Sequence, residues 1–364
     1  MRIAILGTRG IPNNYGGFEQ LAEYLSVGLI EKGHEVFVYN SSLHPYTQPV
    51  FKGVKLIRCF DAEDKLGTAG QFVYDLNCII DSRKRNFDVI LQLGYTSSSV
   101  WHFLLPKKPR IITNMDGLEW LRSKYSKAVQ RFLKRAEKWA VRSSDALIAD
   151  SLGIKKYLDD KYDQPATFIA YGAPVFTAAA EQVIEKYGVE KENYSLLIAR
   201  FEPENNIETV IKGYLKSGNP HPLLLVGSTA NAYGTYLVKK YRDKLIRFLG
   251  PVYERNELDN LRYFSDLYFH GHSVGGTNPS LLEAMACSSR ICAHKNPFNE
   301  AILGNDAFYF SDDDSLAAVI RNKNAEQDRS WVSANLGKIR QHYNWPYIID
   351  EYERLMIKVV KHGS

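Results

Sequence analysis

Two glycine-rich corners, each between an apolar strand-like run and a helix-like run, constrain the fold of this chain more than any other feature. The first occupies residues 7–19 after the apolar run 2–6, and the second occupies residues 271–280 after the run 267–270. Free backbone N–H groups at a helix start, together with the positive end of the helix dipole, favour a phosphate at such a corner. Two corners of this kind predict two Rossmann-like units.

The first corner does not match a dinucleotide-binding fingerprint. Its glycines, at positions 7, 10, 16 and 17, depart from the Gly-x-Gly-x-x-Gly spacing, and the loop is too long. No acidic residue closes the second strand-like run, which ends at Tyr39-Asn40. The sequence therefore disfavours a dehydrogenase. At the second corner a simpler interpretation stays open, in which Asn278 caps the helix that follows.

The alternation of strand-like and helix-like runs predicts an α/β protein with two doubly wound parallel sheets. A chain of 364 residues is long for one core and suits two domains. The strand-like runs are 2–6, 35–39, 54–59, 89–93, 110–113, 146–149 and 167–170, and then 195–199, 222–226, 245–249, 267–270, 290–293 and 308–310. Strand signal is absent from 172 to 193, so we expect domains of residues 1–172 and 173–344. The last helix-like run, 345–360, has an apolar face that needs a partner.

The composition is that of a globular protein. No run approaches the roughly 18 to 20 apolar residues needed to span a bilayer, and the five apolar residues before Gly7 are too few for a secretory signal. We therefore expect a cytoplasmic protein. The four cysteines lack metal-ligand spacing and lie in apolar contexts, which predicts reduced core residues at Cys59, Cys78, Cys287 and Cys292.

The positive charge is concentrated in the first half of the chain. Residues 1–172 hold 24 Lys and Arg against 18 Asp and Glu, and the density is highest over residues 122–142. Apolar residues recur there at helical spacing, so one helix combines an apolar stripe with a basic flank. It is either a solvated surface helix or a peripheral contact with anionic lipid. Nucleic acid is disfavoured because no binding motif accompanies the charge. The cations are Arg122, Lys124, Lys127, Arg131, Lys134, Arg135, Lys138 and Arg142.

Three motifs, in order along the chain, resemble those of retaining family-4 glycosyltransferases of the GT-B fold. They are Gly-Gly-Phe-Glu at 16–19, Arg-Phe-Glu-Pro-Glu-Asn at 200–205 and Asn-Pro-Ser-Leu-Leu-Glu-Ala-Met at 278–285. Within that family the whole chain is similar to bacterial rhamnosyltransferases of capsule and surface-polysaccharide synthesis. The resemblance implies two facing Rossmann-like domains, a nucleotide sugar bound by the C-terminal one, and a C-terminal helix, 345–364, that crosses back onto the first domain.

The chain departs from that family at three positions. The family's paired glutamates would fall at 275 and 283, but position 275 is Gly275, so only the nucleotide-side Glu283 remains. This argues against glucose and mannose donors. The Arg and Lys that clamp the diphosphate correspond to Arg200 and Asn205, and Arg9 in the opposing loop is the candidate to replace the missing cation. Asp116 stands where many relatives place a histidine.

The resemblance implies a site for a nucleotide-sugar donor, dTDP- or UDP-linked, which is a substrate and not a cofactor. The candidate catalytic residues are Arg200 for the phosphate, Glu283 for the ribose and Asp116 for the acceptor hydroxyl. The remaining candidates for binding the donor are Arg9, Gly16, Gly17, Asn205, His272, Gly275, Gly276, Thr277, Asn278, Pro279 and Ser280.

Structural interpretations of these residues stay open. Arg200 could form a surface ion pair, Glu283 could be a solvated helix residue, and Asp116 could be a turn residue before Gly117. The two histidines of the second corner, His270 and His272, fit a structural role better than a catalytic one.

The sequence thus favours an enzyme, a retaining glycosyltransferase that moves a hexose, L-rhamnose from dTDP-L-rhamnose in the leading hypothesis. The acceptor would be a glycan or a polyprenyl-linked saccharide. No metal is predicted, because the acidic run 312–314 precedes a helix-like run and is typical of a helix N-cap. The alternatives are a nucleotide-sugar epimerase of the same fold and a non-catalytic sugar-nucleotide-binding protein.

Overall fold

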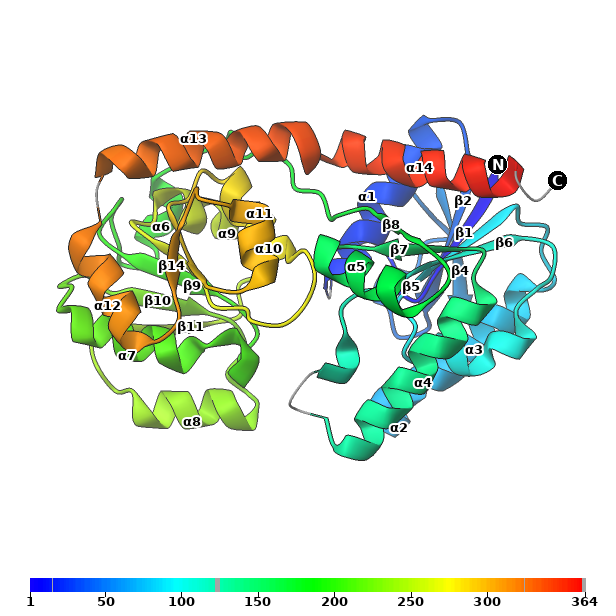
Figure 1. The fold of residues 1–364 in the computed structure, drawn as a ribbon, viewed down its shortest axis with the longest axis horizontal. Coiled ribbons are helices and arrows are strands. Elements are labelled where there is room, and N and C mark those ends of the chain that lie inside the picture. Colours follow the sequence, from blue (N-terminus) through cyan, green and yellow to red (C-terminus); the bar gives the residue numbers. More distant parts are fainter. Residues whose placement is uncertain (15, 122–124, 324, 362–364) are drawn as a thin grey trace. The chain divides into compact units, whose positions relative to one another are not determined.

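The computed structural model describes residues 1–14, 16–121, 125–323 and 325–361. The chain forms two compact units. Unit 1 comprises Met1–Tyr171 and Trp345–Ser364, and unit 2 comprises Gly172–Asn344. Figure 1 labels many of the elements of each unit.

Unit 1 is built on an eight-stranded sheet of order β3-β4-β2-β1-β5-β6-β7-β8. All neighbours are parallel except the edge pair β3 and β4. The strands are β1 (Arg2–Leu6), β2 (Glu35–Ser41), β3 (Val50–Phe51), β4 (Val54–Cys59), β5 (Val89–Leu93), β6 (Arg110–Asn114), β7 (Ala146–Ala149) and β8 (Ala166–Phe168). The α-helices are α1 (Gly17–Glu31), α2 (Glu63–Leu66), α3 (Gly70–Ser82), α4 (Lys127–Ser143), α5 (Leu152–Lys161) and α14 (Trp345–Lys361).

The short strand β3 is absent from the predicted strands. It pairs antiparallel with β4 across a two-residue turn, Lys52 and Gly53, whose φ angles are both positive. Turns of that shape match the twist of a hairpin. A strand of two residues is too short to show the alternation of apolar and polar residues from which a strand is predicted.

Unit 2 has a six-stranded, wholly parallel sheet of order β11-β10-β9-β12-β13-β14. The strands are β9 (Ser195–Ile198), β10 (Leu223–Val226), β11 (Ile246–Gly250), β12 (Tyr268–His270), β13 (Ile291–His294) and β14 (Phe308–Phe310). The α-helices are α6 (Gln182–Glu185), α7 (Ile207–Ser217), α8 (Ala232–Lys240), α9 (Arg255–Phe264), α10 (Pro279–Ala286), α11 (Pro297–Leu303), α12 (Asp313–Asn322) and α13 (Ala325–His342).

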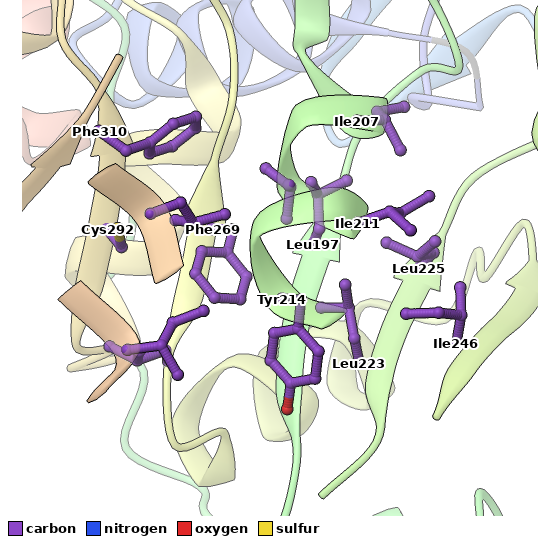
Figure 2. Close-up of a cluster of buried hydrophobic side chains, with 14 of the residues drawn as sticks. Leu197, Ile207, Ile211, Tyr214, Leu223, Leu225, Ile246, Phe269, Cys292 and Phe310 are labelled. Atoms are coloured by element: carbon purple, nitrogen blue, oxygen red, sulfur yellow. The ribbon is translucent and has the colours of Figure 1, made fainter. Parts of the chain in front are cut away.

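The core of unit 2 includes a cluster of apolar side chains between its sheet and helix α7. Side chains from one face of the sheet, among them Leu197, Leu225 and Phe269, meet the buried stripe of α7 (Figure 2). That stripe includes Ile211 and Tyr214, which follow helical spacing. The thiol of Cys292 also lies in this core, and all four cysteines are buried and free, as predicted.

The C-terminal helix α14 packs on unit 1, which confirms the predicted crossover. The rings of Tyr24 and Trp345 stack with their centroids 4.4 Å apart. Gly28 of α1 lies so close to Ile349 that an added Cβ would meet its Cδ1 atom at 2.4 Å. Tyr352 accepts a hydrogen bond of 2.9 Å from Asn114 at the end of β6. In the part of the chain that is described, no helix is both long and apolar enough to cross a membrane.

Candidate functional site

The strand order of unit 2 places the predicted donor residues on two neighbouring loops. The chain winds from β9 towards β10 on one side, whereas β12 lies on the other side of β9. Ligands of doubly wound sheets bind at the carboxyl ends of the strands where the order reverses. The loop after β9 carries Arg200 and Asn205, and the loop after β12 carries residues 271–278. Hydrogen bonds join these loops. Ser273 donates to the carbonyl of Glu204 from its backbone N at 3.1 Å and from its Oγ at 2.8 Å, and Asn206 Nδ2 donates to Gly271 O at 2.8 Å.

The phosphate-binding potential of the second corner lies before the helix and not at its start, which corrects the sequence prediction. Pro279 has no N–H, and the N–H of Ser280 already donates to Oδ1 of the N-cap Asn278 at 2.9 Å. By contrast, the backbone N–H groups of Gly275, Gly276 and Asn278 have no acceptor among the described residues. The signal was available in the sequence, because a proline at the first helical position removes a donor.

Gly275 meets the requirements of a backbone that approaches a ligand. Its φ is +129°, a region that side chains disfavour, and a Cβ built there would meet nothing within 4 Å. The space that a side chain at position 275 would occupy is therefore free of other described protein atoms. Thr277, two residues on, is buried with 3% of its surface exposed.

Glu283 is not a solvated helix residue. Its Oε2 accepts a hydrogen bond of 2.5 Å from Nη2 of Arg262, whose side chain is 3% exposed. Nη1 of the same guanidinium donates to Asp259 at 3.0 Å. Burial is the largest single influence on the pKa of Arg262 and lowers it, but the nearby negative groups, Glu283 first among them, together raise the pKa above its usual value. Arg262 thus fixes the Glu283 carboxylate, a role that the sequence analysis missed because the two residues lie on different helices.

Arg200 and Asn205 have different environments. Arg200 is exposed, and its guanidinium forms no ion pair with any residue that the structure describes, so the interpretation as a surface ion pair is wrong. Asn205 is buried, with 6% of its surface exposed, and its Nδ2 donates to the carbonyl of Arg200 at 2.7 Å. Its amide is therefore engaged in shaping the loop and does not substitute for a cation.

His272 stacks on His270 with ring centroids 4.4 Å apart and planes inclined by 13°. The carbonyl of His272 accepts hydrogen bonds from the amides of Asn296 and Asn299 at 3.0 and 3.1 Å. These bonds fix the backbone between β12 and the glycines.

The first corner, in unit 1, is organised by two acidic residues, Glu19 and Glu63, to which the sequence analysis assigned no role. Glu19 is buried and accepts from Thr8 Oγ1 at 3.1 Å and from Arg9 N at 2.9 Å. The guanidinium of Arg9 forms a two-pronged ion pair with Glu63, at 2.9 and 2.5 Å. Its charge is therefore balanced within unit 1, which weakens its candidacy as the replacement cation.

The glycines of this corner begin α1. Gly16 is the N-cap and Gly17 the first helical residue, and no described side chain forms a cap hydrogen bond there. Gly7, at the end of β1, has a φ of +85°, and a Cβ there would lie 2.2 Å from the carbonyl oxygen of Leu93. The positive φ and this overlap require a glycine at the position, which lies where the strand order of unit 1 reverses between β1 and β5.

Asp116 is a half-buried turn residue with a φ of +49°. Its N–H donates to Oδ1 of Asn114 at 3.0 Å, a side-chain turn that tolerates the left-handed region. The residue follows the carboxyl end of β6 by two positions.

A second carboxylate of unit 1, Asp75 of α3, was not predicted. Burial raises its pKa to about 6, against a hydrogen bond of 2.5 Å from Ser97 Oγ that lowers it. Perturbed carboxylates at a sheet's carboxyl edge are candidates for functional groups.

The basic helix α4 presents its cations to solvent. Its one acid, Glu137, is 1% exposed and faces inward, where it accepts from Tyr157, Tyr162 and Lys161 at 2.9, 2.6 and 2.7 Å. The described cations of α4 are all exposed and form no ion pair with a described residue, while Lys134 lies 4.1 Å from the ring centre of Trp120. They are Lys127, Arg131, Lys134, Arg135, Lys138 and Arg142. Arg122 and Lys124 lie outside the described residues.

The acidic run 312–314 is a helix start, as predicted. Asp312 caps α12 in a capping box with Ser315, and Lys216 pairs with Asp313 at 2.7 Å and with Asp314 at 3.0 Å. Among the described residues, no group of three or more His, Cys, Asp or Glu could hold a metal ion.

Comparisons with known proteins bear on the fold. Residues 1–174 match a protein-family model described as a domain of unknown function, DUF1972. No curated protein matches the sequence. Sucrose-phosphate synthase from Thermosynechococcus elongatus has a similar structure, with a TM-score of 0.80 at 17% identity over 99% of each chain.

Two further solved structures are similar over nearly the whole chain. Anabaena HepE in complex with UDP and glucose has a TM-score of 0.75 at 14% identity, covering 98% of each chain. The α,α-trehalose 6-phosphate synthase of Burkholderia multivorans has a TM-score of 0.68 at 12% identity, covering 100% of this chain and 99% of its own. The chain therefore has the α/β fold of GT-B glycosyltransferases, with two parallel-sheet domains, as the sequence predicts.

Proposed function

We propose that this protein is a glycosyltransferase that takes its sugar from a nucleotide donor bound by unit 2. One observation carries the proposal. An exposed Arg200 and the N–H groups of Gly275, Gly276 and Asn278, none of which has a partner among the described residues, lie on the two loops at the switch point of the sheet. Cationic and N–H donors without partners suit a diphosphate. The GT-B fold supports the same assignment, and the similar HepE was solved in complex with UDP-glucose.

Each residue of unit 2 has a role in this proposal. Arg200 makes a charge-assisted contact to the diphosphate, and the loop N–H groups hold the same anion as negative charge develops on the leaving group. Glu283, fixed by Arg262, accepts a hydrogen bond from the ribose. Transfer proceeds with retention. It needs no metal ion, because these donors balance the phosphate charge. In unit 1, Asp116 orients the acceptor hydroxyl.

We further infer the donor and acceptor classes from the residues that replace the family pattern. Gly275 provides no carboxylate for sugar hydroxyls, which favours a sugar other than glucose or mannose, with L-rhamnose carried by dTDP as the leading choice. The acceptor is a glycan or a polyprenyl-linked saccharide of surface-polysaccharide synthesis.

The central experiment separates a transferase from its two alternatives. Purified protein is titrated with dTDP, UDP, GDP and ADP by calorimetry, and the nucleotide that binds is then supplied as its sugar conjugate with and without saccharide acceptors. A transferase forms a glycosylated product only when acceptor is present. An epimerase converts the donor without acceptor, and a binding protein leaves it intact; either result would refute the proposal.

The exposed cations of α4 support a peripheral position at an anionic membrane, where a polyprenyl-linked acceptor resides. Each Lys or Arg near such a surface contributes about 1 kcal/mol, so four contribute about 4 kcal/mol, or roughly a thousandfold in affinity. Lys134 is best left in place, because its contact with Trp120 makes it part of the packing.

We therefore expect a variant with Lys127, Arg131, Arg135 and Lys138 changed to Gln to lose co-sedimentation with phosphatidylglycerol vesicles. The matched control changes Lys191, Lys239, Arg242 and Lys244 of unit 2, which are equally exposed, to Gln. Raised salt should release the parent protein because exposed charges are screened. Equal sedimentation of both variants would show that α4 is a solvated surface helix.

A further inference from the structure

His270 ends β12 as a buried histidine. The residue is 1% exposed, and neither Nδ1 nor Nε2 has a hydrogen-bond partner in the part of the chain that the structure describes. A neutral imidazole has one N–H donor and one acceptor nitrogen. Buried polar groups are nearly always hydrogen-bonded, so each exception calls for a partner that the protein alone does not provide.

The pleat of β12 gives the direction in which His270 points. Phe269 lies in the core cluster beside α7, so its two neighbours in the strand point to the opposite face of the sheet. On that face the hydroxyl of Tyr268 lies 2.6 Å from Oγ of Ser280, in the first turn of α10. His270 is one strand repeat nearer to the carboxyl edge, on the side of the segment that leads into α10.

The ring of His272 covers one face of the His270 ring. Ring nitrogens present their hydrogen and lone pair in the ring plane, so the stacked ring of His272 satisfies neither nitrogen of His270. Because the amides of Asn296 and Asn299 hold the His272 carbonyl, the backbone between the two rings is fixed. The two rings stand at the start of the loop that continues to Gly275, where a built Cβ meets no described atom within 4 Å.

We propose that His270 is a specificity-determining residue that exchanges hydrogen bonds with a hydroxyl of the donor sugar, at the end of the site where Gly275 supplies no carboxylate. This inference rests on the proposed function. A hydroxyl both donates and accepts, as does a neutral imidazole, so one sugar hydroxyl can complete the unmet bonds. Burial, and then the neighbouring His272 and His294, hold the pKa of His270 far below its usual value, which keeps the ring neutral.

The test compares two ligands in His270→Phe, which keeps an aromatic ring for the stack and removes both nitrogens. Calorimetry measures the dissociation constants of the nucleotide diphosphate, dTDP or UDP, and of the matching nucleotide sugar. We expect the nucleotide diphosphate to bind within twofold of the parent and the nucleotide sugar to bind about tenfold or more weakly. His221→Phe is the matched control, because His221 precedes β10 at the opposite end of the same sheet and should change neither constant.

A second measurement does not depend on the folding of the variant. In the parent protein labelled with ¹⁵N-imidazole histidine, the His270 nitrogens should shift when the nucleotide sugar is added and not when the nucleotide diphosphate is added. Equal losses for both ligands, or no shift specific to the sugar, would overturn the assignment of His270. If the parent binds no nucleotide diphosphate at all, the proposed function itself fails, and this inference fails with it.

Discussion

Replacing Glu283 by Gln should lower both the stability of unit 2 and its affinity for nucleotide. In the folded protein the Glu283 carboxylate, 19% exposed, balances the guanidinium of Arg262, 3% exposed. A hydrogen bond to a charged group contributes about 1.5–3 kcal/mol and a neutral one about 0.5–1.5. Gln keeps the acceptor and removes the charge, while Asp259 still pairs with Arg262. We therefore expect a loss of about 1–2 kcal/mol.

Arg262→Met perturbs the same ion pair by removing its cation. It leaves the carboxylates of Glu283 and Asp259 without their shared cation, and removal of one partner from a buried pair costs about 3–5 kcal/mol. Because Glu283 is partly exposed, water can solvate its carboxylate, so we expect a loss of stability near the lower value, about 3 kcal/mol. For a unit of this size, 1 kcal/mol corresponds to about 2–4 °C in melting temperature. Glu283→Gln should thus melt about 2–8 °C lower, and Arg262→Met further still.

Differential scanning calorimetry of the full chain measures these shifts, and titration with dTDP or UDP measures the nucleotide affinity of each variant. Loss of affinity in Glu283→Gln without any shift in melting would refute the argument that Arg262 and Glu283 stabilise each other. An Arg262→Met protein as stable as the parent would refute it equally. A double variant that loses less stability than the two single variants together would support the coupling.

Three other predictions follow from named contacts. Arg200→Ala should weaken dTDP or UDP binding about 10- to 100-fold by calorimetry, whereas the exposed Arg242→Ala should not; an unchanged affinity would remove Arg200 from the site. Asp75 has a folded pKa of about 6 against 3.8, so its contribution to stability is present below pH 3.8 and about 3 kcal/mol is lost as the pH rises through 6. Asp75→Asn should therefore raise the melting temperature at pH 7.5 but not at pH 4, and equal effects at both would contradict the shift. Product formation should survive excess EDTA, and a loss restored by Mg²⁺ or Mn²⁺ would contradict metal-independent transfer.

The sequence was sufficient to predict two parallel sheets and every strand except β3, because apolar strand runs and amphipathic helices are local patterns. It was insufficient where a side chain finds a partner far along the chain. Arg9 pairs with Glu63, 54 residues away, and no local sequence pattern predicts that pairing. The same holds for Arg262 and Glu283, which share a contact only after α9 and α10 have packed on the sheet.

One correction could have been made from the sequence. Pro279 cannot donate a backbone hydrogen bond, and an Asn before it is a typical cap, so the donors for an anion had to lie earlier in the loop. The burial of His270, in contrast, depends on which face of β12 it occupies and on how closely the next elements cover it. A three-residue strand carries too little alternation to tell the two faces apart.

The placement of α14 in unit 1 makes unit 2 an insertion within another domain, with consequences for synthesis of the chain. Residues 172–344 are continuous and can form their own core as soon as they leave the ribosome. Unit 1 must wait, because the partner of Tyr24 is Trp345 and the bond between His34 and Glu353 spans 319 residues. Until those residues arrive, the apolar side of α1 that receives α14 stays uncovered. During synthesis, unit 2 can therefore complete its fold before unit 1 does.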